Sequence, residues 1–245
     1  MLTGKRILIV GASRGLGEAI ARECAAEHAS VVLTGRKPET LQPVVDSIRE
    51  QGEKADFIVW DIKNVTEGPS VFDRASEMMG GIDIVINNAG VIGRKRLYDV
   101  DEEEWNMIFD TNVKGAFFCM QTACKFFEAH NAEREVKGKI IVVSSETGHQ
   151  PCVHPYGISK WSVMGMCQGY AKAFFKRGIV VQNIAPGPVT TEMMNWTEGK
   201  SAEYPSAFGR MAYPKEIAEL AVFLASDKSN RIAGQPIYIN GGLNC

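Results

Sequence analysis

The chain has 245 residues, of which 45% are hydrophobic and 23% charged, and its formal net charge is −2. These values are typical of a globular protein with one large core, and they argue against nucleic acid or a membrane surface as a partner. No stretch approaches the roughly 20 apolar residues of a membrane-spanning helix, and the N-terminal segment lacks a signal-peptide pattern. We therefore expect a cytoplasmic protein.

Hydrophobic runs rich in β-branched residues alternate along the chain with segments of helical length. The predicted strands span residues 6–10, 30–34, 55–60, 82–86, 139–143, 179–183 and 236–239, and the predicted helices span residues 15–27, 39–51, 66–79, 102–129, 156–176 and 215–225. Strands that are hydrophobic almost throughout are typical of a parallel sheet buried on both faces. The alternation predicts an α/β fold over residues 1–245: a single-domain, Rossmann-type, doubly wound parallel sheet of about seven strands, with helices on both faces.

The first predicted strand leads directly into the glycine-rich sequence GASRGLG, residues 11–17, which opens a helix. Its first glycine allows a tight turn, and the other two let the backbone approach a pyrophosphate at the helix N-terminus. The spacing differs from the commoner G-x-G-x-x-G, and an ordinary strand-to-helix turn is the alternative for an isolated match. Because a strand precedes it and a helix follows, we predict that it binds a dinucleotide through Gly11, Ser13, Arg14, Gly15, Leu16 and Gly17.

The end of the second predicted strand indicates which nicotinamide cofactor binds. NAD-binding sheets of this kind place an acid there to accept a hydrogen bond from the ribose 2′-hydroxyl, whereas this strand continues into Gly35, Arg36 and Lys37. A guanidinium at Arg36 can pair with a 2′-phosphate in bidentate fashion, and Arg14 supplies a second positive charge. The alternative is that Arg36 and Lys37 only cover a surface turn. The missing acid favours NADP(H).

Tyr156 and Lys160 are four residues apart and therefore lie on one face of a predicted helix. A tyrosine hydroxyl ordinarily titrates at about pH 10, so it exchanges protons at neutral pH only if a nearby charge such as the Lys160 ammonium stabilises its phenolate. Upstream, Ser144 and Ser145 follow the strand 139–143, where a hydroxyl can hold a substrate carbonyl against the tyrosine. A surface pair on a helix and two capping hydroxyls are the alternative readings.

Together these features resemble the short-chain dehydrogenase/reductase family, and in particular its 3-oxoacyl-carrier-protein reductase-like members, along nearly the whole chain. The matching motifs are GASRGLG at 11–17, Asp61-Ile62, Asn87-Asn88-Ala89-Gly90, Asn112, Ser144-Ser145, Tyr156-x-x-x-Lys160, the segment 186–191 and Ile239-Asn240-Gly241-Gly242. The interval from the serines to Tyr156 is shorter than in the family pattern.

The resemblance implies a role for each matching residue. Tyr156 would donate the proton in reduction, and Lys160 would lower the pKa of Tyr156 and bind the nicotinamide ribose. Asn112 would bend its helix and hold a water that relays protons to Lys160. Ser145 would orient the carbonyl, with Ser144 as the alternative. Cofactor contacts are also implied for Asp61, Ile62, Asn88, Ala89, Gly90, Val189 and Thr191.

Two further segments are expected near this site. Residues 188–213 are rich in Met and aromatic side chains and are expected to form a lid over an apolar substrate, although such residues are also typical of a core. His149 and His154 flank the loop before Tyr156. Because the motif set already supplies an acid, we expect them to line the substrate site or to belong to an ordinary loop.

The sequence therefore predicts an NADP(H)-dependent oxidoreductase that interconverts a carbonyl and an alcohol as a small-molecule substrate. The six cysteines form no C-x-x-C pair, so no metal site is expected. One alternative is a sugar or polyol dehydrogenase that works oxidatively. Another is a nicotinamide-binding regulator without catalysis, which would not need all four residues Asn112, Ser145, Tyr156 and Lys160. Surplus small and apolar residues in the helices 102–129 and 156–176 predict a homodimer or homotetramer.

Overall fold

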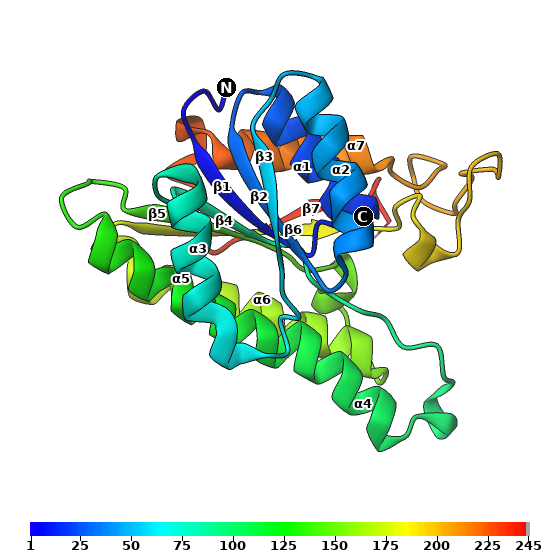
Figure 1. The fold of residues 1–245 in the computed structure, drawn as a ribbon. Helices are drawn as coiled ribbons and strands as arrows, with labels where there is room; N and C mark the ends of the chain where they lie inside the picture. Colours follow the sequence, from blue (N-terminus) through cyan, green and yellow to red (C-terminus); the bar gives the residue numbers. More distant parts are fainter. Residues whose placement is uncertain (244–245) are drawn as a thin grey trace.

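The computed structural model describes residues 1–243 and contains one seven-stranded parallel sheet (Figure 1). Its strands are β1 (Arg6–Val10), β2 (Ser30–Gly35), β3 (Ala55–Val59), β4 (Ile84–Asn87), β5 (Gly138–Val143), β6 (Ile179–Pro186) and β7 (Pro236–Ile239). They follow the order β3-β2-β1-β4-β5-β6-β7, and each neighbouring pair is parallel. The predicted Rossmann-type sheet is thus confirmed. Asn244 and Cys245, at the end of the predicted domain, lie outside the described residues.

Helices cover both faces of this sheet (Figure 1). One face packs against α1 (Gly15–Ala26), α2 (Pro38–Glu50) and α7 (Pro214–Ala225), and the other against α3 (Gly68–Met79), α5 (Ala116–His130) and α6 (Pro155–Phe174). In β1, Ile7 and Ile9 belong to the first core, whereas Leu8 and Val10 belong to the second. Because successive side chains of a strand face opposite sides, such a strand is hydrophobic at most positions, as the sequence indicated.

One predicted helix is divided in the structure. The sequence pattern predicted a single helix over 102–129, but α4 (Glu102–Phe109) passes into a π-helical turn (Asp110–Gly115) before α5 begins. The prediction of one continuous helix is wrong here. A π turn adds one residue to a helical turn, and this addition changes the spacing of apolar residues too little to be recognised in the sequence. Such π turns are frequent at functional sites, and this one carries Asn112.

The carboxyl ends of the strands form the edge where ligands bind in sheets of this type. The strand order reverses between β1 and β4, and in sheets of this type the ligand crevice lies at such a point. Residues 91–101 after β4 and 188–213 after β6 both extend from this side (Figure 1). The second segment returns to its own start: Thr190 N–H donates to Ala212 O at 2.9 Å, and Ala212 N–H donates to Pro188 O at 2.9 Å. The expected lid is therefore a loop anchored beside the crevice.

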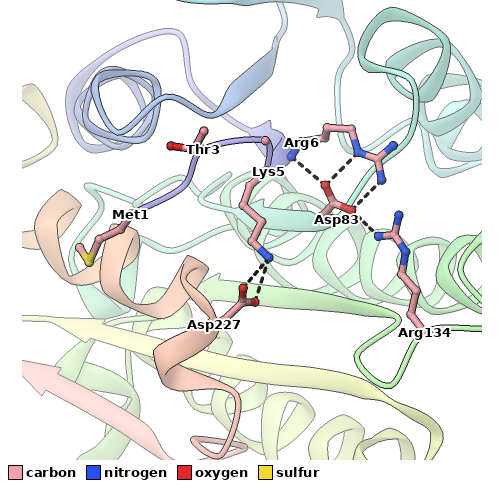
Figure 2. A pocket seen from close by; sticks show the side chains of 8 residues that line it. Met1, Thr3, Lys5, Arg6, Asp83, Arg134 and Asp227 are labelled. Carbon is pink, nitrogen blue, oxygen red and sulfur yellow. Dashed lines mark hydrogen bonds and ion pairs between the residues drawn. The ribbon is translucent and has the colours of Figure 1, made fainter.

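The opposite edge, at the amino ends of the strands, holds a cavity of about 480 Å³ that Figure 2 shows from close by. Asp83 accepts hydrogen bonds from Arg6 at 2.7 Å and from Arg134 at 2.6 Å, and Lys5 pairs with Asp227 at 2.8 Å. Each of these cations thus has a carboxylate partner. The pairs connect the starts of β1 and β4 and hold this edge together.

Two general features complete the fold. Within residues 1–243, no helix combines the length and the apolar character needed to cross a membrane. Cys24, Cys119, Cys124 and Cys167 are buried free thiols, and Cys152 is a half-buried one.

Candidate active site

The glycine-rich turn after β1 has the close packing that dinucleotide binding requires. Gly11 has a φ of +80°, and a Cβ added to Gly17 would lie 2.1 Å from Gly11 O. Neither position can carry a side chain without moving the backbone. Asn88 Nδ2 donates to Gly11 O at 2.8 Å, so this predicted cofactor residue has a second task, the bracing of the turn. Space for phosphate oxygens is thereby kept at the start of α1, where the helix dipole favours an anion.

The two arginines predicted to choose NADP(H) differ in their surroundings. Arg36 is exposed, and no carboxylate of the described residues pairs with it. Arg14 donates from Nη1 to Glu192 Oε2 at 2.7 Å, and both side chains are about 70% exposed. No local sequence pattern indicates Glu192 as a partner of Arg14, because 178 positions separate the two residues. Arg36 is thus free for a phosphate, whereas Arg14 must first leave Glu192.

The remaining predicted cofactor residues follow the carboxyl ends of β1, β3, β4 and β6. A Cβ on Gly15 would lie 3.6 Å from Thr191 Cγ2, so the glycine loop and the start of segment 188–213 face each other. Asp61 Oδ1 accepts from Lys63 N–H at 3.0 Å. Ile62 is 4% exposed, and its side chain packs against the π turn. An adenine would therefore contact the backbone of Ile62 rather than its side chain. Ser13 and Gly90 are half-buried, Leu16 and Ala89 pack against the two cores, and Val189 is buried.

Tyr156 and the two serines come together at the carboxyl end of β5. The Ser145 side chain is near enough to the Tyr156 hydroxyl to lower its pKa, and its Oγ accepts from Thr147 Oγ1 at 3.0 Å. Ser144 instead donates to Asn183 Oδ1 at 2.5 Å and to Ile184 O at 3.2 Å, which turns it into the sheet. Of the two serines, only Ser145 influences the pKa of Tyr156, so Ser145 stays the predicted partner of the tyrosine.

Burial raises the pKa of the Tyr156 hydroxyl, and the hydrogen bond from Ser145 opposes this shift only in part. This rise in the pKa of Tyr156 is opposite to the fall expected from the charge of Lys160 alone. The Lys160 amine lies 5.7 Å from the centre of the Tyr156 ring and donates to Val143 O at 3.1 Å rather than to the phenol. In this structure the phenol is therefore held protonated by desolvation.

Lys160 is buried, and desolvation lowers its pKa to about 8. Val143 O is its one hydrogen-bond acceptor among residues 1–243. An ammonium carries three donors, so two remain for a ligand. A Cβ on Gly90 would lie 3.3 Å from Lys160 Nζ and 3.5 Å from Asn112 Oδ1. Gly90 thus lets the end of β4 approach both catalytic candidates.

Asn112 connects the π turn to the loop after β4 and to α6. Its Oδ1 accepts from Val91 N–H at 2.8 Å, and its Nδ2 donates to Val91 O at 2.9 Å and to Ser159 Oγ at 3.0 Å. Ser159 in turn donates to Tyr156 O at 2.6 Å. The side chain is only 2% exposed. The sequence pattern identified Asn112 but neither of its partners, Val91 and Ser159.

His154 is the residue whose place in the site was missed. It caps α6: its Nδ1 accepts from Tyr156 N–H at 3.4 Å, and its Nε2 lies 3.1 Å from Lys95 O. A polar residue directly before a proline that starts a helix was the available signal, since Pro is favoured at the first helical position. His149, by contrast, is exposed, with its ring 5.4 Å from that of Tyr238.

The donor set fits a nicotinamide dinucleotide. The glycine turn leaves no room for a Cβ where phosphates would approach, Arg36 is a free cation at the end of β2, and Lys160 keeps two donors for ribose hydroxyls. When bound, the nicotinamide supplies or accepts a hydride.

Known proteins resemble this chain along nearly its full length. Residues 11–244 match the family model described as enoyl-(acyl carrier protein) reductase. The chain is 32% identical over 246 residues to a 3-oxoacyl-[acyl-carrier-protein] reductase of Staphylococcus aureus, with 98% of each chain covered. It is 31% identical over 257 residues to the L-2,3-butanediol dehydrogenase of Corynebacterium glutamicum, again with 98% of each covered.

A solved structure agrees with these matches. A short chain dehydrogenase from Burkholderia cenocepacia J2315, in complex with NADP, superposes with a TM-score of 0.89 at 30% identity, over 100% of this chain and 99% of that chain. The chain therefore belongs to the short-chain dehydrogenase/reductase family of oxidoreductases.

Proposed function

We propose that this protein transfers hydride between NADP(H) and a carbonyl or secondary alcohol, with Tyr156 exchanging the proton. The observation that carries the proposal is the grouping of the Tyr156 ring with the buried ammonium of Lys160, 5.7 Å from the ring centre, and with the Ser145 side chain, which lowers the pKa of the Tyr156 hydroxyl. Two hydroxyls that meet at the carboxyl end of a strand can bind one carbonyl oxygen between them. A cation nearby favours the negative charge that develops on that oxygen.

Each residue has a defined share in the reaction. Ser145 donates to the carbonyl oxygen and holds it against Tyr156. The Tyr156 hydroxyl then donates its proton to that oxygen, and the raised pKa of Tyr156 keeps the phenol protonated, which suits reduction. Lys160 stabilises the resulting phenolate and binds the ribose hydroxyls. Asn112 fixes the loop after β4 and supports α6 through Ser159, and the proton relay to Lys160 through a water remains part of the proposal.

The choice of NADP(H) over NAD(H) rests on the end of β2. Arg36 is exposed, has no carboxylate partner within residues 1–243, and follows a strand that ends without an acid. A free guanidinium there attracts a 2′-phosphate, whereas it offers a 2′-hydroxyl no comparable gain. We expect an Arg36→Ala variant to lower the ratio of kcat/KM for NADPH to that for NADH by about tenfold or more, which corresponds to a charge-assisted hydrogen bond. An unchanged ratio would contradict this assignment.

The substrate is proposed to be a ketone with an apolar body. Exposed hydrophobic side chains gather on three segments at the carboxyl edge: residues 91–101, the loop before α6, and residues 188–213. They are Leu97 and Tyr98, Val153, and Met193, Met194 and Phe208, with exposed fractions from 39% to 97%. Apolar residues that remain exposed on loops around a site are typical of surfaces that bind an apolar ligand.

A substrate panel tests this function. The purified protein is mixed with NADPH and, separately, with simple ketones, a series of 3-oxoacyl thioesters of increasing chain length, and polar ketoses. We expect oxidation of NADPH that becomes more efficient with apolar length, as judged from kcat/KM. A preference for the ketoses would contradict the apolar substrate, and cofactor binding without turnover on any carbonyl would contradict the enzymatic function.

The layer that contains α4, α5 and α6 is proposed to join copies of this chain into a homodimer or homotetramer. Exposed aromatic residues lie on neighbouring helices of one sheet face: Trp105 on α4, Phe117 and Phe118 on α5, and Trp161 on α6, each at least 37% exposed. These helices belong to one layer (Figure 1), and a second copy would present an identical apolar surface to them. Sedimentation of the wild type and of a Phe118→Asp, Trp161→Asp variant tests this: we expect the wild type to be oligomeric and the variant to be smaller.

A further inference from the structure

At the start of α6, the backbone N–H of Tyr156 is the first N–H group that has no hydrogen-bond acceptor within the helix. Pro155 occupies the first position of α6 and has no N–H. The next residue is Tyr156, whose N–H cannot bond within the first turn of the helix. His154 Nδ1 accepts this N–H at 3.4 Å. The backbone of the proposed proton donor is therefore held by a histidine side chain.

The second ring nitrogen of His154 reaches a different segment. Nε2 lies 3.1 Å from Lys95 O, in the loop after β4. A carbonyl only accepts and a backbone N–H only donates. The two contacts together require a neutral imidazole with its proton on Nε2 and a lone pair on Nδ1. With both nitrogens engaged, His154 has no free nitrogen for acid-base chemistry on a substrate.

The loop that His154 contacts is also held by Asn112 and by α4. Asn112 makes two hydrogen bonds to Val91, at 2.8 Å and 2.9 Å. The N–H of Lys95 faces both carboxylate oxygens of Glu104 at 3.3 Å, and Glu104 is 8% exposed. The loop is thus fixed at Val91 by one catalytic candidate and at Lys95 through His154, which also holds Tyr156.

We propose that His154 is a positioning residue that sets Tyr156 relative to loop 91–95, which Asn112 also holds. This inference rests on the proposed proton transfer at Tyr156. A cap alone would stabilise α6 without fixing the distance across the site. The bridge from Tyr156 N–H through the imidazole to Lys95 O fixes both sides at once, and small displacements of reacting groups are costly in rate.

Two substitutions separate the cap from the bridge. His154→Asn keeps a good helix cap, because asparagine is among the preferred residues at this position, but its side chain is too short to reach Lys95. His154→Ala removes both contacts. His130→Ala is the matched control: it removes a histidine at the end of α5 whose Nδ1 lies 3.0 Å from Phe126 O, away from the site.

The first readout compares turnover with stability. We expect His154→Ala to lower kcat by about tenfold and also to lower the unfolding temperature, whereas His154→Asn restores the temperature but leaves kcat reduced by about fivefold. The KM for NADPH stays within about twofold of the wild type in both, since neither contact touches the proposed cofactor site. Full recovery of kcat in His154→Asn, or an unchanged kcat in His154→Ala, overturns the proposal.

The second readout does not depend on activity. Amide hydrogen exchange is followed in peptides that cover residues 91–101 and 152–162. We expect faster exchange in both peptides for His154→Ala, and in the 91–101 peptide alone for His154→Asn. Unchanged exchange at 91–101 in both variants overturns the bridge even if no substrate is found. A wild type that reduces no ketone, together with the expected exchange pattern, contradicts the proposed function and leaves the bridge supported.

Discussion

The two ends of β5 each hold a buried lysine, and the comparison separates a structural lysine from a functional one. Lys139 is the second residue of the strand and is 3% exposed, whereas Lys160 of α6 donates to the carbonyl of Val143, the last residue of the strand, and is 5% exposed. Desolvation lowers the pKa of both amines to about 8. Neither burial nor pKa therefore distinguishes them.

Their hydrogen bonds do. The Lys139 ammonium donates to Leu224 O at 3.1 Å, to Ser229 Oγ at 3.0 Å and to Ser226 O, so all three donors are used at the C-terminal end of α7. Lys160 uses one donor, to Val143 O. A buried ammonium with two unused donors is costly unless a ligand completes its shell. The incomplete shell at the carboxyl edge, not the shifted pKa, marks the site.

The largest expected effect is the loss of Lys160. A Lys160→Met variant keeps the volume and the burial but removes both the cation and the free donors. We expect kcat/KM for the reduction of a ketone to fall by about 10³-fold, because the Tyr156 phenolate loses the nearby cation and the ribose loses a hydrogen-bond donor. Folding is retained, since removing a buried charge is rarely destabilising when an apolar group fills its place. Steady-state kinetics and circular dichroism check both statements, and a variant with more than about a tenth of wild-type activity would break the comparison.

The two serines after β5 give the next effect. We expect Ser145→Ala to lower kcat/KM by about 10²-fold, because it removes a donor to the carbonyl oxygen. Ser144→Ala is the matched control: it loses the bonds to Asn183 and Ile184 and about 1 kcal/mol of stability, with little change in activity. Equal losses of activity in the two variants would show that the hydroxyl facing Tyr156 has no special role.

Lys139 is expected to affect stability rather than turnover. Its pKa is about 8 in the folded protein and 10.5 in the unfolded chain, so the unfolded chain binds more protons between these values. The free energy of unfolding therefore gains from this group as the pH rises from 8 to 10.5, by up to about 3 kcal/mol. We expect Lys139→Met to lack this gain while it keeps wild-type kcat at pH 7. Denaturant unfolding at several pH values measures the difference, and parallel curves for the two proteins would contradict it.

The smallest effect concerns the exposed pair of Arg14 and Glu192. Glu192 competes with a 2′-phosphate for the guanidinium, and exposed ion pairs are worth about 1 kcal/mol or less. We expect Glu192→Gln to raise the ratio of kcat/KM for NADPH over NADH by about two- to fivefold. Glu198→Gln, in the same loop, serves as the control. An equal change of kcat/KM for NADPH and NADH would contradict this prediction, because it would show that Glu192 acts on the loop and not on the contact with the 2′-phosphate.

The sequence predicted those features that follow from local pattern. Strands buried on both faces are hydrophobic at most positions, and the predicted strand ends agree with the observed ones within three residues. The glycine turn, Ser145, Tyr156 and Lys160 were located because their spacing is contained in short motifs.

The features that were missed depend on contacts between distant residues. His154 meets Lys95 across 59 positions, and Arg14 meets Glu192 across 178. No local pattern contains either pair. The direction of the Tyr156 pKa shift was also missed, because it follows from burial, which a motif does not reveal. The π turn was missed for a third reason: one added residue hardly alters the apolar spacing of the helix.

The most direct test of the account is a Tyr156→Phe variant measured for both cofactor binding and turnover. The substitution removes only the hydroxyl that Ser145 contacts. We expect NADPH to bind within about twofold of the wild-type Kd, while kcat for ketone reduction falls by at least about 10²-fold. A variant that binds NADPH normally and retains most of its kcat would contradict the assignment of the proton donor, and with it the site at the carboxyl end of β5.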